Sequence, residues 1–135
     1  MTLDMLLRAT ELITEDMTTA LRADGLTQAR AKALWRVAAR APLTQRELAD
    51  ALEVTPRNVT TLVDALEAAG FVTRGSHPDD RRAIWVDLTG KGRTAVTRLR
   101  ESADRLAEQL FGGLSPEELA AANRAFAAVA EHFTT

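Results

Sequence analysis

The hydrophobic repeat of this 135-residue sequence changes twice, and each change restricts the fold. In the first half, apolar side chains recur every three or four residues, which is the period of helices with one buried face. Residues 71–74 and 84–88 instead favour strands, and the second segment places Ile84, Val86 and Leu88 on one face. The helical period then returns. We therefore expect a mainly α-helical fold interrupted by one small β-hairpin.

Capping and helix-breaking residues set the bounds of the helices in the first half. Helices are expected over 3–22, over about 28–40, from Thr44 and from Thr55, and Gly70 ends the last of them. A capping box at the third helix and a proline in the first turn of the fourth support these starts. The predicted buried positions are Ala33, Leu34, Val37, Leu48, Ala49, Leu52, Val59, Leu62, Val63 and Leu66, and Trp35 is expected to pack among the helices.

Two further helices are expected after the hairpin, over about 90–110 and from Ser115 onward. Their apolar residues are spaced three and four apart in turn, a narrow stripe typical of coiled-coil-like packing. The stripes can pack within one chain, but two in so short a chain favour packing between chains. A homodimer is therefore expected, and its predicted interface consists of Leu3, Leu6, Ile13, Leu99, Leu106, Leu110, Leu119, Phe126, Val129 and Phe133.

Two short helices with a tight turn, followed at once by a hairpin, form a winged helix-turn-helix. Burying the apolar face of the second helix turns Arg57, Asn58 and Thr61 outward near its N-terminus. Such side chains bind base edges or phosphates in the major groove. The hairpin presents Arg81 and Arg82 beside that helix, within reach of a minor groove. The alternatives are a solvated helix face and a surface salt-bridge cluster.

Charge and composition limit the other function classes. The net charge is −2, but the middle of the chain (28–93) has eleven basic and eight acidic residues, whereas both ends are acidic. Local potential steers a polyanion, so this pattern gives modest support to double-stranded DNA as the partner. We see no phosphate loop, nucleophile motif or cysteine, and His77 lacks a second nearby histidine. We expect no enzyme activity, no cofactor, no metal site, no membrane association and a cytoplasmic location.

The stretch from Leu43 to Gly92 resembles the multiple-antibiotic-resistance regulator (MarR) family of dimeric winged-helix repressors. The most specific part is an Asp-x-Arg, a strand, then Leu-Thr and a glycine. The resemblance implies that Arg82 enters the minor groove and that Asp80 orients its guanidinium group. It also implies one domain over 1–135, with a DNA-binding lobe at 28–92 and dimerisation helices at 1–24 and 92–135. The predicted DNA contacts are Thr44, Gln45, Thr55, Arg57, Asn58, Thr60, Thr61, Arg74, Asp80, Arg81 and Arg82.

The same resemblance implies a small aromatic or anionic effector, bound where the first, second and fifth helices meet. The residues expected there are Met17, Leu21, Trp35, Arg36, Val96 and Arg100, and the alternative is a packed core with no cavity. A second alternative concerns function. The same winged-helix dimer can serve as a protein-interaction adaptor that does not bind DNA.

Overall fold

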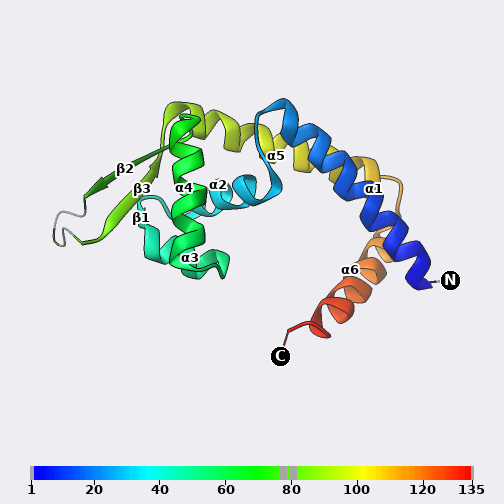
Figure 1. Ribbon diagram of the computed structural model, residues 1–135. Coiled ribbons are helices and arrows are strands. Elements are labelled where there is room, and N and C mark those ends of the chain that lie inside the picture. The colour runs from blue at the N-terminus through cyan, green and yellow to red at the C-terminus, as the bar shows by residue number, and fades with distance from the viewer. Residues whose placement is uncertain (1, 77–78, 80–81, 135) are drawn as a thin grey trace. The chain divides into compact units, whose positions relative to one another are not determined.

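The computed structural model describes residues 2–76, 79 and 82–134, and Figure 1 labels its elements. The chain divides into two compact units, Met1–Leu99 and Arg100–Thr135. The elements are α1 (Thr2–Ala23), α2 (Gln28–Arg40), β1 (Leu43–Thr44), α3 (Gln45–Leu52), α4 (Pro56–Ala68), β2 (Val72–Ser76), β3 (Ile84–Leu88), α5 (Gly90–Phe111) and α6 (Pro116–Glu131). The predicted fold class, mainly helical with a small β wing, is confirmed.

Side-chain caps explain where three helices of the first unit begin. Thr27, Thr44 and Thr55 are N-caps, and each hydroxyl oxygen accepts a hydrogen bond from the backbone N–H three residues later, at 3.0–3.2 Å. The ends of α3 and α4 turn through left-handed backbone at Glu53 (φ 56°) and Gly70 (φ 84°). The predicted starts at Thr44 and Thr55 and the predicted end at Gly70 are confirmed.

The hairpin belongs to a three-stranded antiparallel sheet with the order β1-β3-β2. β2 and β3 pair along their whole lengths. The other edge of β3 pairs with β1, through Leu43 opposite Val86 and Thr44 opposite Trp85. The sequence pattern does not predict β1, because a strand of two residues has no alternation to detect. This strand joins the start of α3 to the base of the wing.

The core of the first unit is formed by side chains from all of its helices and from the sheet. Its predicted members are buried, except for Leu62, which is partly buried at the edge of the core. The buried apolar residues are Leu21, Leu26, Ala33, Leu34, Val37, Leu43, Leu48, Ala49, Leu52, Val59, Val63, Leu66, Phe71, Val72, Val86, Ala95 and Val96.

The prediction that Trp35 packs among the helices is wrong, and one residue of the predicted strand face lies outside the core. Trp35 is 40% exposed, because its neighbour Leu34 and, one turn on, Val37 already occupy the core side of α2. Ile84 is also 40% exposed, although Val86 on the same face is fully buried. Ile84 pairs with Ser76 at the outer end of the hairpin, where the wing extends beyond the core. Strand alternation identified the face correctly but not how far the core reaches along it.

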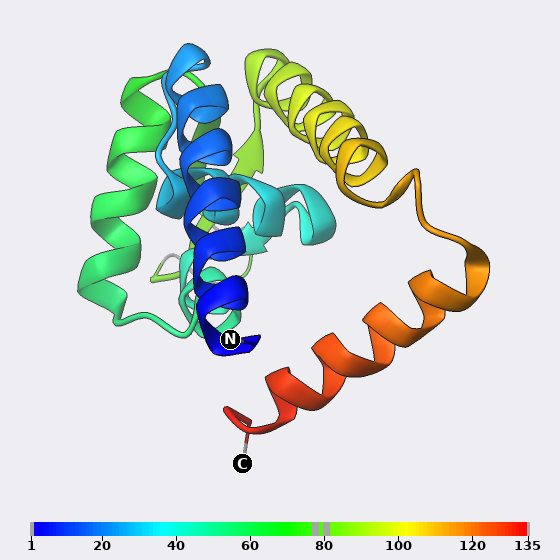
Figure 2. The same cartoon turned by 90° about the vertical axis from the view of Figure 1, so that its right-hand side faces the viewer.

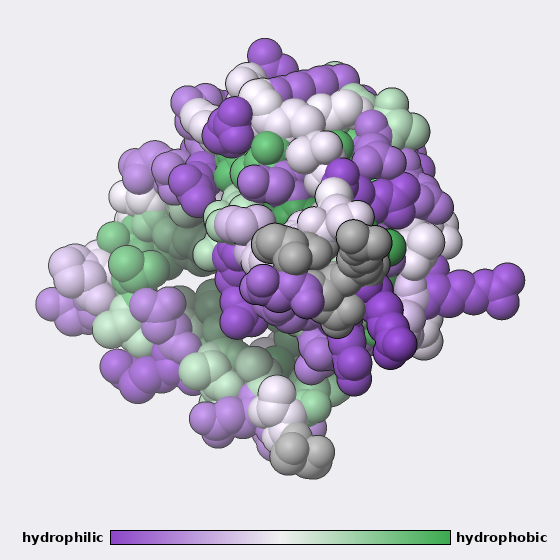
Figure 3. Space-filling view, turned by 90° about the vertical axis from the view of Figure 1, so that its left-hand side faces the viewer, coloured by the Kyte–Doolittle hydropathy of each residue, from purple (hydrophilic) through white to green (hydrophobic). Residues whose placement is uncertain are grey.

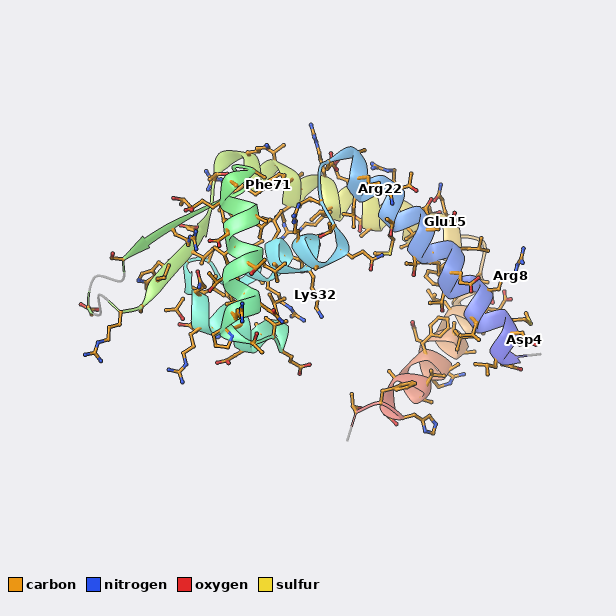
Figure 4. All side chains as sticks on the ribbon, viewed as in Figure 1. Asp4, Arg8, Glu15, Arg22, Lys32 and Phe71 are labelled. Atoms are coloured by element: carbon orange, nitrogen blue, oxygen red, sulfur yellow. The ribbon has the colours of Figure 1, made fainter. Side chains whose placement is uncertain are left out.

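A dense junction joins the end of α4 to the start of α5, around Phe71 (Figure 4). The hydroxyl of Thr89 donates to the carbonyl oxygen of Gly70 and accepts from the backbone N–H of Gly92 at 3.0 Å. The ammonium group of Lys91 donates to the carbonyl oxygen of Ala69 at 2.7 Å. A Cβ atom at residue 92 would collide with the backbone carbonyl of Phe71, so glycine is required there. These contacts explain why a glycine stands at position 92, shortly after Leu88-Thr89.

The second unit is the end of α5 and the whole of α6, which Figure 2 shows as two helices. The predicted capping box is confirmed: Ser115 Oγ accepts from the Glu118 N–H at 3.1 Å, and Glu118 Oε1 accepts from the Ser115 N–H at 3.0 Å. The backbone hydrogen bond from Ser115 holds the pKa of the Glu118 carboxyl below its ordinary value. The ring centroids of Phe111 and Phe126 lie 6.5 Å apart. No residue of α6 is buried.

Candidate nucleic-acid interface

The helix-turn-helix is formed by α3 and α4, and α4 presents a polar face at its N-terminal end. Val59 and Val63 are buried on one side of α4, which turns Arg57, Asn58 and Thr61 to solvent. The three exposed side chains lie within the first turns of the helix, as the sequence predicts. Many hydrophilic side chains surround the wing in Figure 3.

A groove of about 660 Å³ brings the wing together with the first turns of α3 and α4. Arg82, just before β3 in the loop of the wing, lines it together with Gln45 from α3 and Thr60 from α4. Arg46 also lines this groove and is exposed, yet the sequence analysis did not select it. The available signal was its position beside Gln45 in the first turn of a helix that precedes the recognition helix.

Several predicted contact residues already make hydrogen bonds within the protein. The hydroxyl oxygens of Thr44 and Thr55 cap α3 and α4. The Thr60 hydroxyl donates to the carbonyl oxygen of Pro56 at 2.9 Å, and Thr61 makes the same kind of bond to Arg57 at 3.2 Å. The hydroxyl groups of Thr44 and Thr55 therefore stabilise the starts of the two helices, and those of Thr60 and Thr61 donate to the backbone of α4.

Arg74 of β2 contacts two carboxylates of α4. Its guanidinium group lies 2.6 Å from Asp64 Oδ1 and 3.0 Å from Glu67 Oε1. Its backbone N–H donates to Glu67 Oε2 at 3.2 Å, and its second guanidinium nitrogen is 3.5 Å from Gln45 Oε1. Hydrogen bonding from Arg74 holds the pKa of Glu67 below its ordinary value, and Glu67, followed by Asp64, raises the pKa of Arg74. Arg74 thus joins the wing strand to the recognition helix.

Three residues of the wing prediction lie outside the described residues: His77, Asp80 and Arg81. The roles that the resemblance gives to Asp80 and Arg81 stay predictions. Among the residues that the structure describes, no group of three or more histidine, aspartate or glutamate side chains is placed to hold a metal ion. No described helix is long and apolar enough to cross a membrane.

The residues predicted for an effector pocket differ in their surroundings. Leu21 and Val96 are buried in the core of the first unit. Met17 and Trp35 are 43% and 40% exposed, and Arg36 is exposed. The sixth residue, Arg100, belongs to the second unit. The pocket itself stays a prediction.

The residues predicted for the dimer interface are mostly exposed. Leu3 of α1 is 65% exposed, Phe126 of α6 is 51% exposed and Phe133 is 84% exposed. In α1 the sequence analysis missed the exposed apolar side chains of Met5 (74%) and Leu12 (54%). They lie off the three-and-four spacing that the prediction followed. Charged residues labelled in Figure 4 also lie along α1, at Asp4, Arg8, Glu15 and Arg22.

Comparison with known proteins agrees with this architecture. Residues 26–84 match the model of the MarR family. The chain is 31% identical over 75 residues to the HTH-type transcriptional regulator YwhA of Bacillus subtilis, a match that covers 56% of this chain and 54% of YwhA. The chain spans about half the length of the curated relatives it matches.

Solved structures show the same fold over almost the whole chain. FabT of Streptococcus pneumoniae, crystallised in complex with DNA, has a TM-score of 0.88 at 21% identity, covering 96% of this chain and 93% of FabT. The S. aureus MepR–DNA complex has a TM-score of 0.80 at 20% identity, covering 99% of both chains. The family predicted from the wing motif is confirmed, and it is a family of transcriptional regulators rather than enzymes. Residues 26–84, which hold the helix-turn-helix and the first strand of the wing, match the MarR family model, and the chain is similar to transcriptional regulators.

Proposed function

We propose that this protein is a transcriptional regulator that binds double-stranded DNA as a homodimer. The observation that carries the proposal is the groove where Arg82 of the wing meets the first turns of α3 and α4. Beside it, Arg57 and Asn58 are exposed on α4. Arginine and asparagine side chains bind guanine and adenine edges in the major groove, and arginine enters narrow minor grooves. α4 and the wing thus contact adjacent grooves of one duplex.

The dimer is supported by the apolar side chains exposed on α1, α5 and α6. Fully burying one such side chain contributes about 1.5–3 kcal/mol, so a second copy covering several of them makes a stable assembly. A two-fold dimer places one recognition helix at each half of a pseudo-palindromic site, with the halves about 34 Å apart. A dimer bound over a promoter excludes polymerase, so we infer repression, and a regulator of this kind acts in the cytoplasm, where bacterial DNA lies.

Fluorescence anisotropy with duplexes selected by the protein from a randomised library tests DNA binding directly. Arg57→Ala should weaken binding by about 1–3 kcal/mol and relax base preference at one position. Arg8→Ala is the matched control, because it removes the same charge from the exposed side of α1. Equal losses for the two variants, or binding that salt does not weaken, would favour the adaptor alternative.

The wing is tested by its own variants. Arg82→Ala should weaken binding most on duplexes with A·T-rich flanks, where the minor groove is narrow. Asp80→Ala should give a milder form of the same loss, because the guanidinium group remains but is badly aimed. Binding by Arg82→Ala as tight as that of the parent would remove the wing from the mechanism.

Release from DNA is proposed to require a small aromatic or anionic molecule. In support, Trp35 is 40% exposed and carries a ring on which an aromatic molecule can stack, and Arg36 is exposed and carries the charge to pair with a carboxylate. A ligand shifts binding only through its different affinity for the two dimer shapes. Release should be measured with salicylate-like acids and with peroxide in parallel. Release by peroxide at doses that spare methionine, with no response to any aromatic acid, would contradict this part of the proposal.

A further inference from the structure

Two carboxylates of the recognition helix hold Arg74 of the wing strand β2. Asp64 and Glu67 lie one turn apart on α4 and both contact one guanidinium nitrogen, at 2.6 and 3.0 Å. The Arg74 side chain is 23% exposed, compared with 57% for Asp64 and 41% for Glu67. One positive charge is thus flanked by two negative charges. This cluster carries a local charge of −1, which does not attract a phosphate.

Glu67 contacts Arg74 in two ways. One oxygen of its carboxylate accepts from the guanidinium group, and the other accepts from the backbone N–H of residue 74 at 3.2 Å. The backbone bond fixes the position of β2 relative to α4, and the side-chain bond fixes the direction of the arginine. A carboxylate with both oxygens engaged restricts orientation more than a single ion pair does.

The same cluster extends through α3 back to the start of α4. Gln45 Oε1 is 3.5 Å from a guanidinium nitrogen of Arg74, and Gln45 Nε2 donates to the Thr60 hydroxyl at 2.9 Å. Thr60 in turn donates to the carbonyl oxygen of Pro56. The chain of bonds therefore links the wing strand, the first residue of α3 and the first turn of the recognition helix.

We propose that Arg74 is a positioning residue that sets the angle between the wing and the recognition helix, and that it does not bind phosphate. This proposal rests on the proposed DNA-binding function. The physical reason is that α4 and the wing must reach two grooves of one duplex at the same time. An error in the angle between them loses contacts in one groove or the other. Asp64, Glu67 and Gln45 act through Arg74 in the same way.

Salt dependence distinguishes a positioning residue from a phosphate contact. The logarithm of the binding constant falls linearly with the logarithm of salt concentration, and the slope decreases by about 0.9 for each lost phosphate contact. Arg74→Gln should weaken binding to the selected duplex by about tenfold, within the range for coupled neighbours, and leave the slope unchanged. Arg46→Gln is the matched variant, because it removes an exposed cation of the groove on the helix that precedes the recognition helix and crosses the DNA backbone, and it should reduce the slope.

Two further variants keep the test valid if Arg74→Gln folds poorly, which circular dichroism would show. Arg74→Lys keeps the charge but cannot hold both carboxylates, so it should fail to restore the preference for the selected duplex over a random one. The double variant Asp64→Asn with Glu67→Gln leaves Arg74 in place and removes two negative charges. It should bind random duplex more tightly and yet lose preference for the selected duplex.

The opposite results would overturn the positioning role. These are a smaller salt slope for Arg74→Gln, full rescue by Arg74→Lys, or tighter binding of both duplexes by the double variant with the preference unchanged. A parent protein that selects no duplex and shows no salt-dependent binding would overturn the proposed function itself. The failure of one proposal is therefore distinguishable from the failure of the other.

Discussion

The two units of this molecule contain similar helices but differ in what those helices bury. In the first unit Leu34, Val63 and Leu66 have no exposed surface, and the core draws on helices and sheet alike. In the second unit α6 buries no residue, and Phe126 and Phe133 are 51% and 84% exposed. Both units have well-formed helix caps, so local helix signals do not account for the difference. The difference lies in tertiary packing.

This comparison indicates that the first unit is folded by its own core, whereas the second needs another surface. Chains below about 40 residues seldom bury enough apolar area to be stable alone and need a disulfide, a metal or a partner. The second unit, Arg100–Thr135, is shorter than that, and the sequence contains no cysteine. The exposed apolar side chains of α1 also need another surface, because Leu21 is the residue of α1 that is buried in the core. We propose that a second copy of the chain supplies the missing surface.

The largest effect is expected at α6. Phe126→Glu should abolish the dimer or unfold the protein, because it removes an apolar side chain and places a charge in the interface of both copies. Sedimentation velocity over a range of concentrations measures this. Arg124→Glu, on the same helix but outside the apolar stripe, is the control and should leave the dimer intact. A Phe126→Glu protein that sediments as the parent does would place α6 outside the interface.

A core substitution in the first unit should instead act within one chain. Leu66→Ala should lower the free energy of unfolding by about 2–5 kcal/mol, since Leu66 is fully buried and leaves a cavity. In urea denaturation, the difference in free energy of unfolding between Leu66→Ala and the parent should be the same at low and high protein concentration. A loss that grows as the protein is diluted would mean that this core, too, depends on the partner.

At the junction between α4 and α5, a larger residue in place of Gly92 should destabilise the protein. Gly92→Ala should destabilise the first unit by about 1–3 kcal/mol, because the new Cβ meets the backbone of Phe71 rather than a flexible side chain. Gly90→Ala is the matched control, since a Cβ there meets nothing within 4 Å. Thermal unfolding of the two variants should separate them. Equal melting temperatures for the two variants would show that the backbone at Phe71 can shift to accommodate the added methyl group.

The smallest effect is expected at the cap of α6. Ser115→Ala should lower the stability of the protein by about 1 kcal/mol and should weaken assembly. Thr27→Ala, its counterpart in the first unit, should destabilise that unit without changing assembly.

The capping box also predicts a pH dependence. The pKa of Glu118 is lowered from 4.5 in the folded protein, so its contribution is complete above that value and is lost as the pH falls through the lowered pKa. Glu118→Gln should remove this acid sensitivity, as measured by sedimentation between pH 3 and 6, roughly the range over which carboxyl groups titrate.

Sequence reasoning predicted the elements well and their surroundings less well. Threonine and serine caps and the glycine at position 70 act locally, so they located the helices that the structure shows. Trp35 was misplaced because periodicity cannot show that the core side of α2 is already filled by Leu34 and Val37. Arg74 was predicted to contact DNA because it matches the family's first-strand pattern. Its two carboxylate partners, Asp64 and Glu67, come from another element and become visible only after folding.

Sedimentation equilibrium of the unmodified chain at micromolar concentration tests the central claim most directly. The exposed faces of α1, α5 and α6 predict a single species of twice the chain mass of 14.7 kDa, and any monomer formed on dilution should lose the helices of the second unit. A stable monomer of 14.7 kDa with the helix content of the parent would contradict the account. It would show that the terminal helices need no second copy, and the two-fold clamp on DNA would lose its basis.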